Sequence, residues 1–147
     1  MGKEVDFSDY PMWILLAALS IPLSVLIAFN LVAILLFIAG ITAGLIIGFV
    51  AAKRELHAIE TGGEYKASLK TIAYFAVSIL VAILIFIAFS GTTYRVFVAF
   101  GPTWASCCCF RAAMSWTCLK WEKKQGKIIM YDGFLGRRQY AVPKTTP

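Results

Sequence analysis

Arg111 has the most distinctive chemistry in this sequence, because it lies inside the apolar stretch that runs from Val96 to Cys118. A cation toward the centre of a bilayer costs at least ~2.5 kcal/mol on insertion scales, so it normally has a partner or a route to water. No Asp or Glu lies in any of the long apolar stretches of this chain. Two interpretations stay open. Either Arg111 extends to the headgroups, or it pairs with a carboxylate of another subunit or with a bound anionic lipid.

Three adjacent cysteines, Cys107, Cys108 and Cys109, raise the question of a metal or redox centre. Successive residues of a helix are ~100° apart, so these thiols fan around the axis instead of converging. Cys118 is about three turns away, and the single histidine, His57, lies in a polar segment. We therefore expect no metal and no cofactor, with the cysteines acting as small apolar packing side chains.

The rest of the sequence contains no residue pattern typical of catalysis. No serine, histidine and carboxylate are gathered in a pattern typical of nucleophilic or acid–base catalysis. Coupling to protons or sodium requires ionisable groups at membrane depth, and Arg111 is the only charged residue there. We therefore expect a protein that is not an enzyme and not a secondary transporter.

The composition indicates the surroundings in which these residues lie. Of 147 residues, 60% are apolar and 15% are charged, and the mean hydropathy is +0.77. An ordinary soluble domain is about half apolar and about a quarter charged, so this chain is typical of a bilayer protein. The net charge of +6 indicates membrane topology and anionic lipid as a partner, and no nucleic acid.

The hydropathy pattern predicts an all-α integral membrane fold. Its four transmembrane helices form two hairpins, and a small C-terminal β-hairpin lies on the basic side. The charge-free run 11–52 is about twice the ~20 residues that cross a bilayer, so it must turn, and Asn30 marks the turn. Polar helical extensions in 53–70 meet at Gly62-Gly63. The expected parts are an N-terminal segment 1–10, spans at about 11–29, 31–52, 71–90 and 96–118 within a transmembrane domain 11–118, and a basic tail 119–147.

Charge counting favours four spans over three. Four spans place twelve of the fourteen Lys and Arg residues on the same side as both termini, and leave Arg95 on the other side. The positive-inside rule then places both termini on the cytoplasmic side, or on the equivalent matrix or stromal side.

Small residues recur at helical spacing in three of the expected spans. Helices in a membrane associate through close packing of such residues, so the stripes predict tight helix contacts. In an antiparallel hairpin turning near Asn30, Ser20 would lie close to Gly40. The stripes either hold the chain's own bundle together, or one of them docks a partner helix or lines a pore. Their members are Ser20, Ser24, Gly40, Gly44, Gly48, Gly101, Ala105, Cys109 and Ala113.

The basic tail combines a membrane anchor with a hairpin signal. Lysines beside interfacial tryptophan favour an anionic leaflet, and we expect these residues and Arg111 to contact partner or lipid. Residues 127–131 and 134–142 are predicted as two strands joined by an Asp132-Gly133 turn. An isolated hairpin is marginal in water, so this one needs a surface to lie on. The expected anchoring residues are Lys120, Trp121, Lys123, Lys124 and Lys127.

Three observations suggest a non-catalytic accessory subunit of a larger membrane complex, an energy-converting or redox complex being one candidate. They are the missing catalytic set, the unmatched Arg111 and the hairpin without a surface. We therefore expect a hetero-oligomer with other integral membrane subunits as partners. A small homo-oligomeric channel or exporter is the first alternative, and a membrane-shaping or trafficking adaptor is the second.

Overall fold

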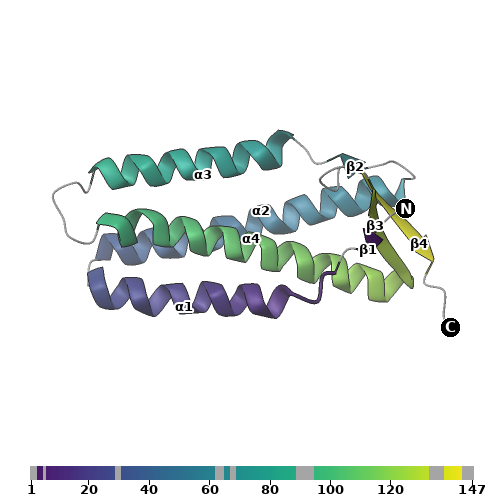
Figure 1. The fold of residues 1–147 in the computed structure, drawn as a ribbon, viewed down its shortest axis with the longest axis horizontal. Helices are drawn as coiled ribbons and strands as arrows, with labels where there is room; N and C mark the ends of the chain where they lie inside the picture. The colour runs from purple at the N-terminus through teal and green to yellow at the C-terminus, as the bar shows by residue number, and fades with distance from the viewer. Residues whose placement is uncertain are drawn as a thin grey trace.

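The computed structural model describes the backbone of residues 3–4, 6–28, 31–61, 65–66, 69–88, 95–132 and 138–143. These residues are mostly helical, as predicted (Figure 1). The helix bounds follow the apolar stretches closely, while the expected turns at Asn30 and Gly62-Gly63 lie outside the described residues. The helices are α1 (Tyr10–Ala28), α2 (Leu31–Glu60), α3 (Leu69–Ala88) and α4 (Arg95–Gln125).

A four-stranded antiparallel sheet lies at one end of the helices. Its strands are β1 (Lys3–Glu4), β2 (Tyr65–Lys66), β3 (Lys127–Asp132) and β4 (Arg138–Pro143), in the order β1-β3-β4-β2. The predicted C-terminal hairpin, β3 with β4, is confirmed. It is completed on both edges by strands from the N-terminus and from the segment between α2 and α3. The sheet therefore joins three polar segments that are far apart in the sequence.

Two local predictions are wrong. The register pairs Asp132 with Arg138, so five residues, 133–137, connect the strands instead of a two-residue Asp132-Gly133 turn. The helix expected after Gly62-Gly63 is also absent at 65–66, because Tyr65 and Lys66 pair with β4 as strand β2.

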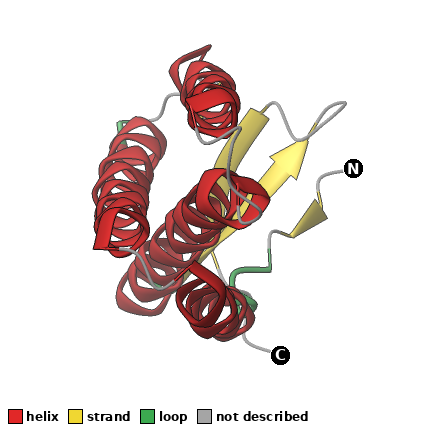
Figure 2. Cartoon of the chain, turned by 90° about the vertical axis from the view of Figure 1, so that its left-hand side faces the viewer, coloured by secondary structure: helices red, strands yellow, loops and turns green. Residues whose placement is uncertain are grey.

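Helix α4 is the centre of the bundle and packs against α1, α2 and α3. Figure 2, which looks along the helices, shows a central helix with the other helices beside it. The first predicted hairpin is wrong for the packing, because the main partner of both α1 and α2 is α4. Helix α3 does pack against α4, as the second predicted hairpin requires. Ala17 of α1 is buried with Cys108 and Cys109 of α4, and Ile41 of α2 packs against this cluster.

The glycines of α2 bring its backbone close to that of α4. A Cβ placed on Gly40 would lie 2.6 Å from the Pro102 carbonyl oxygen, and one on Gly44 would collide with the Ser106 carbonyl oxygen. A Cβ on Gly48 would lie 2.6 Å from the Phe110 carbonyl oxygen. Because both numberings rise together, α2 and α4 run in the same direction. This register brings Glu55, one to two turns beyond Gly48, to the level of Thr117 and Cys118.

Backbone contacts define the ends of α1 and α4. The Asp9 carbonyl accepts the N–H of Met12 at 3.1 Å, which starts α1 and leaves the Asp9 side chain free for other contacts. Gly126 follows α4 with a φ of 61°, and its N–H donates to the Glu122 carbonyl at 2.9 Å. A residue in this left-handed conformation is a common helix end, and it turns the chain directly into β3.

By length and composition one helix, α2, can cross a membrane, as judged on the residues whose side chains are described. Its most apolar stretch has a mean hydropathy of 2.6 and is only 17% buried, unlike the core helix of a soluble protein. This apolar part ends at Ala52, since Lys53 and Arg54 are charged and exposed. The apolar stretches described in α1 and α3, Tyr10–Ser20 and Ala76–Ala88, are shorter. Four spans therefore stay a prediction.

Candidate functional site

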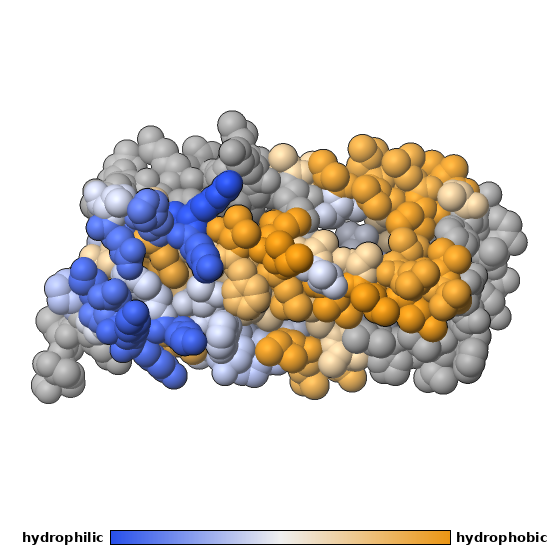
Figure 3. All heavy atoms as spheres, turned by 180° about the vertical axis from the view of Figure 1, so that it is seen from behind, coloured by the Kyte–Doolittle hydropathy of each residue, from blue (hydrophilic) through white to orange (hydrophobic). Residues whose placement is uncertain are grey.

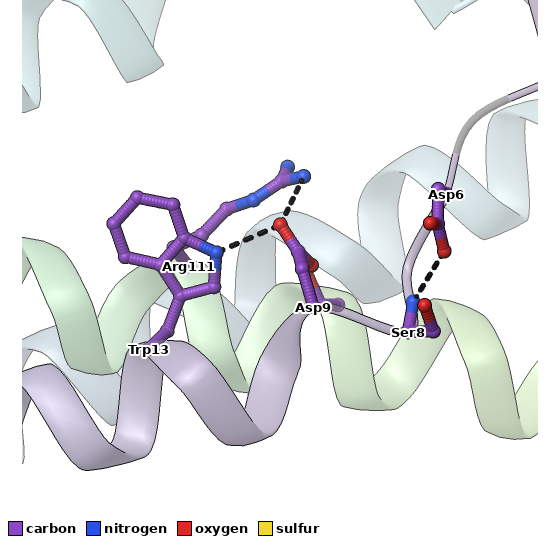
Figure 4. A network of polar contacts seen from close by, with 6 residues as sticks. Asp6, Ser8, Asp9, Trp13 and Arg111 are labelled. Carbon is purple, nitrogen blue, oxygen red and sulfur yellow. Dashed lines mark hydrogen bonds and ion pairs between the residues drawn. The ribbon is translucent and has the colours of Figure 1, made fainter.

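Asp9 is the hub of a polar cluster between α1 and α4 (Figure 4). Its Oδ2 accepts the indole N–H of Trp13 at 2.8 Å and lies 3.4 Å from an Arg111 guanidinium nitrogen. Its Oδ1 accepts the hydroxyl of the buried Ser115 at 3.2 Å. One carboxylate therefore holds the start of α1 against two neighbouring turns of α4.

Arg111 has a counter-ion within its own chain, so the inference that the chain offers none is wrong. Asp9 lies just before the first apolar stretch, outside it, and 102 residues from Arg111. The pair is about one-third exposed, with 34% for the Arg111 side chain and 29% for Asp9. The guanidinium lines a pocket of about 350 Å³ with Trp13 and Trp104, which gives it access to the surroundings.

Glu55 is the anomalous residue of the site. Its exposed fraction is 0%, and neither carboxylate oxygen has a hydrogen-bond partner within the part of the chain that the structure describes. Buried polar groups are almost always hydrogen-bonded, because an unpaired one costs about 1–3 kcal/mol and a charged one costs more. A carboxylate in this position needs a physical explanation.

The surroundings of Glu55 are apolar on several sides. Ala52 and Ile59 lie one turn before and after it on α2, and both belong to a buried cluster with Phe7, Cys118 of α4 and Ile129 of β3. Glu55 therefore lies at the junction where the helices meet the sheet. The only positive charge that acts on it within the described residues is that of Arg111.

Burial raises the pKa of Glu55 from its ordinary value of 4.5 to about 7, although the charge of Arg111 acts in the opposite direction. Desolvation disfavours the ionised form, and it exceeds the attraction of a guanidinium that is already paired with Asp9. Glu55 lies beyond the apolar part of α2, so protein atoms and not lipid cause this shift. The carboxyl group therefore changes protonation state in the physiological range of pH.

The cysteines and the histidine do not form a metal centre among the described residues, where no three metal-ligating side chains come together. All three adjacent cysteines are free thiols: Cys108 and Cys109 are buried against Ala17 of α1, and Cys107 is half-buried and lines the pocket beside Trp104. His57 is exposed on α2. The contacts made by the cysteines are those expected of small apolar side chains.

The residues of the small-residue stripes lie in different surroundings. Gly40, Gly44 and Gly48 face α4, and Ala113 lies against Gly48. Ala105 and Cys109 are buried, Gly101 and Ser20 are half-buried, and the Ser20 hydroxyl donates to the Ala17 carbonyl at 2.7 Å. The side chain of Ser24 lies outside the described residues.

The basic residues of the tail lie at the sheet end of the bundle. Lys123, Lys124 and Lys127 are exposed, and Lys120 lies over the Trp116 ring at 5.0 Å from its centroid. Trp121 is half-buried, and its indole N–H donates to Glu60 at 2.7 Å. Figure 3 shows this hydrophilic end beside an apolar surface formed by described residues of the same face.

An apolar groove of about 380 Å³ separates α2 from α3 above α4. The middle of its α2 wall is made of the small residues Ala39, Gly40 and Ala43, with the larger Leu36 and Ile47 on either side, so a neighbouring helix can approach that part of the backbone closely. Outside the groove, α3 exposes further large apolar side chains, including Ile79, Leu80 and Leu84. The groove is lined by Ala39, Gly40 and Ala43 of α2, Val77, Ser78 and Val81 of α3, and Pro102, Thr103 and Ser106 of α4.

Comparisons with known proteins identify no relatives: no family model, no curated protein and no solved structure matches this chain. The function must therefore be argued from the geometry alone.

Sequence reasoning missed Glu55 and Asp9. A signal for Glu55 is present, because Gly44, Gly48, Ala52, Glu55 and Ile59 follow the three- and four-residue spacing of one helix face. A charged residue that continues a packing stripe is expected to be buried. Asp9 carries no comparable signal, because its partner Arg111 is 102 residues away.

Proposed function

We propose that this chain is an integral membrane protein with four spans that serves as a non-catalytic accessory subunit, docking to other membrane subunits through the groove between α2 and α3. Four spans are supported by the alternating direction of the helices and by the sheet, which brings the N-terminus, the segment after α2 and the C-terminal tail to one end. This end carries the exposed basic residues, as the positive-inside rule requires of the cytoplasmic or equivalent side.

The groove is the observation that carries the docking proposal. Helix α3 packs mainly on α4, so α2 and α3 both leave apolar surface open. Small residues on the α2 wall permit close backbone approach, and apolar surface alone gives no selectivity in lipid. Ser78, Thr103 and Ser106 supply hydroxyl groups along the same groove. The partner is therefore a transmembrane helix with a small-residue face.

Two earlier reasons for a partner no longer support one. Arg111 pairs with Asp9, and the C-terminal hairpin rests on its own chain through β1, β2 and the cluster around Ile129. The channel alternative also loses one proposed wall, because the glycine face of α2 lies against α4 within one chain. The unfilled groove is the feature that now favours a subunit.

Filling the groove is expected to release the partner. We expect the protein to co-purify with other membrane proteins in mild detergent, and Ala43→Leu to lose them because the larger side chain occupies the groove. Ala76→Leu adds the same volume to an exposed position of α3 that does not line the groove, so it keeps the partners.

The readout is the set of proteins that accompany an affinity-tagged chain, with thermal unfolding as a check that both variants fold. A wild-type chain that purifies alone or as a pure homo-oligomer contradicts the proposal. So does a folded Ala43→Leu variant that retains every partner.

A further inference from the structure

We propose that Glu55 is a proton-binding site at the junction of the helices and the sheet, and that its proton determines whether Arg111 pairs with Asp9 alone or is drawn toward Glu55. The proposal concerns the chain by itself and does not depend on its role as a subunit.

The first argument is the state of the carboxyl group in this fold. Glu55 is fully buried, and both oxygens lack a hydrogen-bond partner among the described residues, although Arg111 is close enough for its charge to act on the group. An ionised carboxylate with one cation nearby and no donors is poorly stabilised. This geometry, in which Arg111 donates to Asp9, therefore corresponds to a neutral, protonated Glu55.

The second argument is the pairing of Arg111. A single guanidinium nitrogen lies 3.4 Å from Asp9, and this is its only ion pair in the described part of the chain. An Arg side chain has five N–H donors, so most of them are available to a second carboxylate. Loss of the Glu55 proton creates that second carboxylate in a medium of low dielectric, where attraction to the guanidinium is strong.

The charged and titratable groups around Glu55 are few. Helix α4 contributes Arg111, the buried thiol of Cys118, and Glu122, whose charge acts on that thiol and whose Oε1 accepts the Ile129 N–H at 2.8 Å. The N-terminal segment contributes Asp9 through Arg111. The described side chains of the sheet at this junction, Ile129 and Ala141, are apolar. Among these described groups, Arg111 is the cation whose charge acts on Glu55.

The site is open on the side of Arg111. The Arg111 side chain is about one-third exposed and lines the pocket beside Trp13 and Trp104. A movement of Arg111 away from Asp9 also affects α1, because the same Asp9 carboxylate accepts hydrogen bonds from the Trp13 indole and the Ser115 hydroxyl. Burial places the pKa of Glu55 near 7, so the exchange falls in a range that cells regulate.

Infrared difference spectroscopy on the full chain in lipid nanodiscs tests directly whether Glu55 binds a proton. We expect a protonated-carboxyl band at about pH 5 that is lost by about pH 9, with a midpoint near 7. Glu55→Gln lacks this band. Glu60→Gln, which changes an exposed glutamate on the same helix, retains it.

The indole N–H signal of Trp13 in nuclear magnetic resonance spectra tests whether Arg111 moves from Asp9 toward Glu55. It is expected to shift with the same midpoint in the wild type and to stay fixed in Glu55→Gln, because the bond from Trp13 to Asp9 responds to Arg111. In Asp9→Asn the guanidinium of Arg111 has lost its carboxylate partner and acts on Glu55 alone. It then favours the ionised form of Glu55, so the midpoint of the Glu55 titration moves about one unit to lower pH.

Absence of a protonated-carboxyl band in the wild type overturns the proposal, and this result does not depend on the folding of any variant. A band that titrates unchanged in Glu55→Gln overturns it as well. A Trp13 signal that stays fixed while Glu55 titrates, or an Asp9→Asn midpoint that does not fall, overturns the exchange of Arg111.

Discussion

Gly44→Ala is expected to lower the free energy of unfolding by about 1–3 kcal/mol, even though alanine is the better helix former by about 1 kcal/mol. The added Cβ would collide with the Ser106 carbonyl oxygen, which belongs to a helix backbone and cannot rotate away. Helices α2 and α4 must then separate, and every contact along their shared face weakens. The measurement is reversible unfolding in mixed detergent micelles.

Thr42→Leu provides the control, because Thr42 is an exposed residue of the same helix. This change adds more volume than Gly44→Ala but meets no neighbouring helix, so its effect should stay within about 0.5 kcal/mol. If Gly44→Ala stabilises the protein while Thr42→Leu is neutral, α2 and α4 do not pack through their glycine face.

Glu55→Met is expected to raise the free energy of unfolding by about 2 kcal/mol at about pH 8. Methionine keeps the length of the side chain and removes a buried carboxylate without hydrogen-bond partners. Replacing buried charge by apolar volume is often stabilising by about 1–4 kcal/mol. The gain should be much smaller at about pH 5, where Glu55 is already neutral in the folded protein.

The pH dependence follows from the pKa of Glu55, which is raised from 4.5 to about 7 by folding. Between these values the folded protein holds a proton that the unfolded chain has released. The stability of the wild type therefore falls as pH rises from about 4.5 to about 7, by about 3 kcal/mol in total from this group. Above about 7 both states have lost the proton, and the contribution stays constant.

Unfolding measured at about pH 5 and about pH 8 separates this effect from other titrations. Between these two pH values the wild type should lose about 2.5 kcal/mol through Glu55. Glu55→Met should lack this loss, whereas Glu60→Gln should retain it because Glu60 is exposed. A Glu55→Met variant that is less stable than the wild type at about pH 8 would show that Glu55 is stabilised by its surroundings.

The positions of the helices could be predicted from the sequence, because apolar runs free of charge have few alternatives. The charge-free run 11–52 becomes α1 and most of α2, and the β-prone residues after Lys127 become β3. Both signals are local, since they depend on consecutive residues and not on a partner elsewhere in the chain.

The packing of the helices could not be predicted in the same way. The stripe of Gly40, Gly44 and Gly48 fits any helix with small residues, and two other spans carry such a stripe. The structure selects α4 through Pro102, Ser106 and Phe110. Spacing identifies a packing face, but it does not identify the face that covers it.

The polar contacts of the site depend on distant segments. Asp9 and Arg111 are 102 residues apart, and the two-residue strands β1 and β2 are too short to show an alternating pattern. The Asp9–Arg111 pair and the strands β1 and β2 form only when α1, α2 and α4 bring distant segments together. These contacts therefore depend on the assembled bundle.

Labelling of single cysteines from each side of oriented membrane vesicles tests most directly the claim that four helices cross the bilayer with the sheet on one side. In a chain whose four native cysteines are replaced by alanine, we expect Thr61→Cys and Lys127→Cys to react with an impermeant maleimide only from the cytoplasmic or equivalent side. Thr92→Cys, in the predicted loop before α4, should react only from the opposite side. Reaction of Thr92→Cys from the same side as Thr61→Cys would contradict the four-span arrangement.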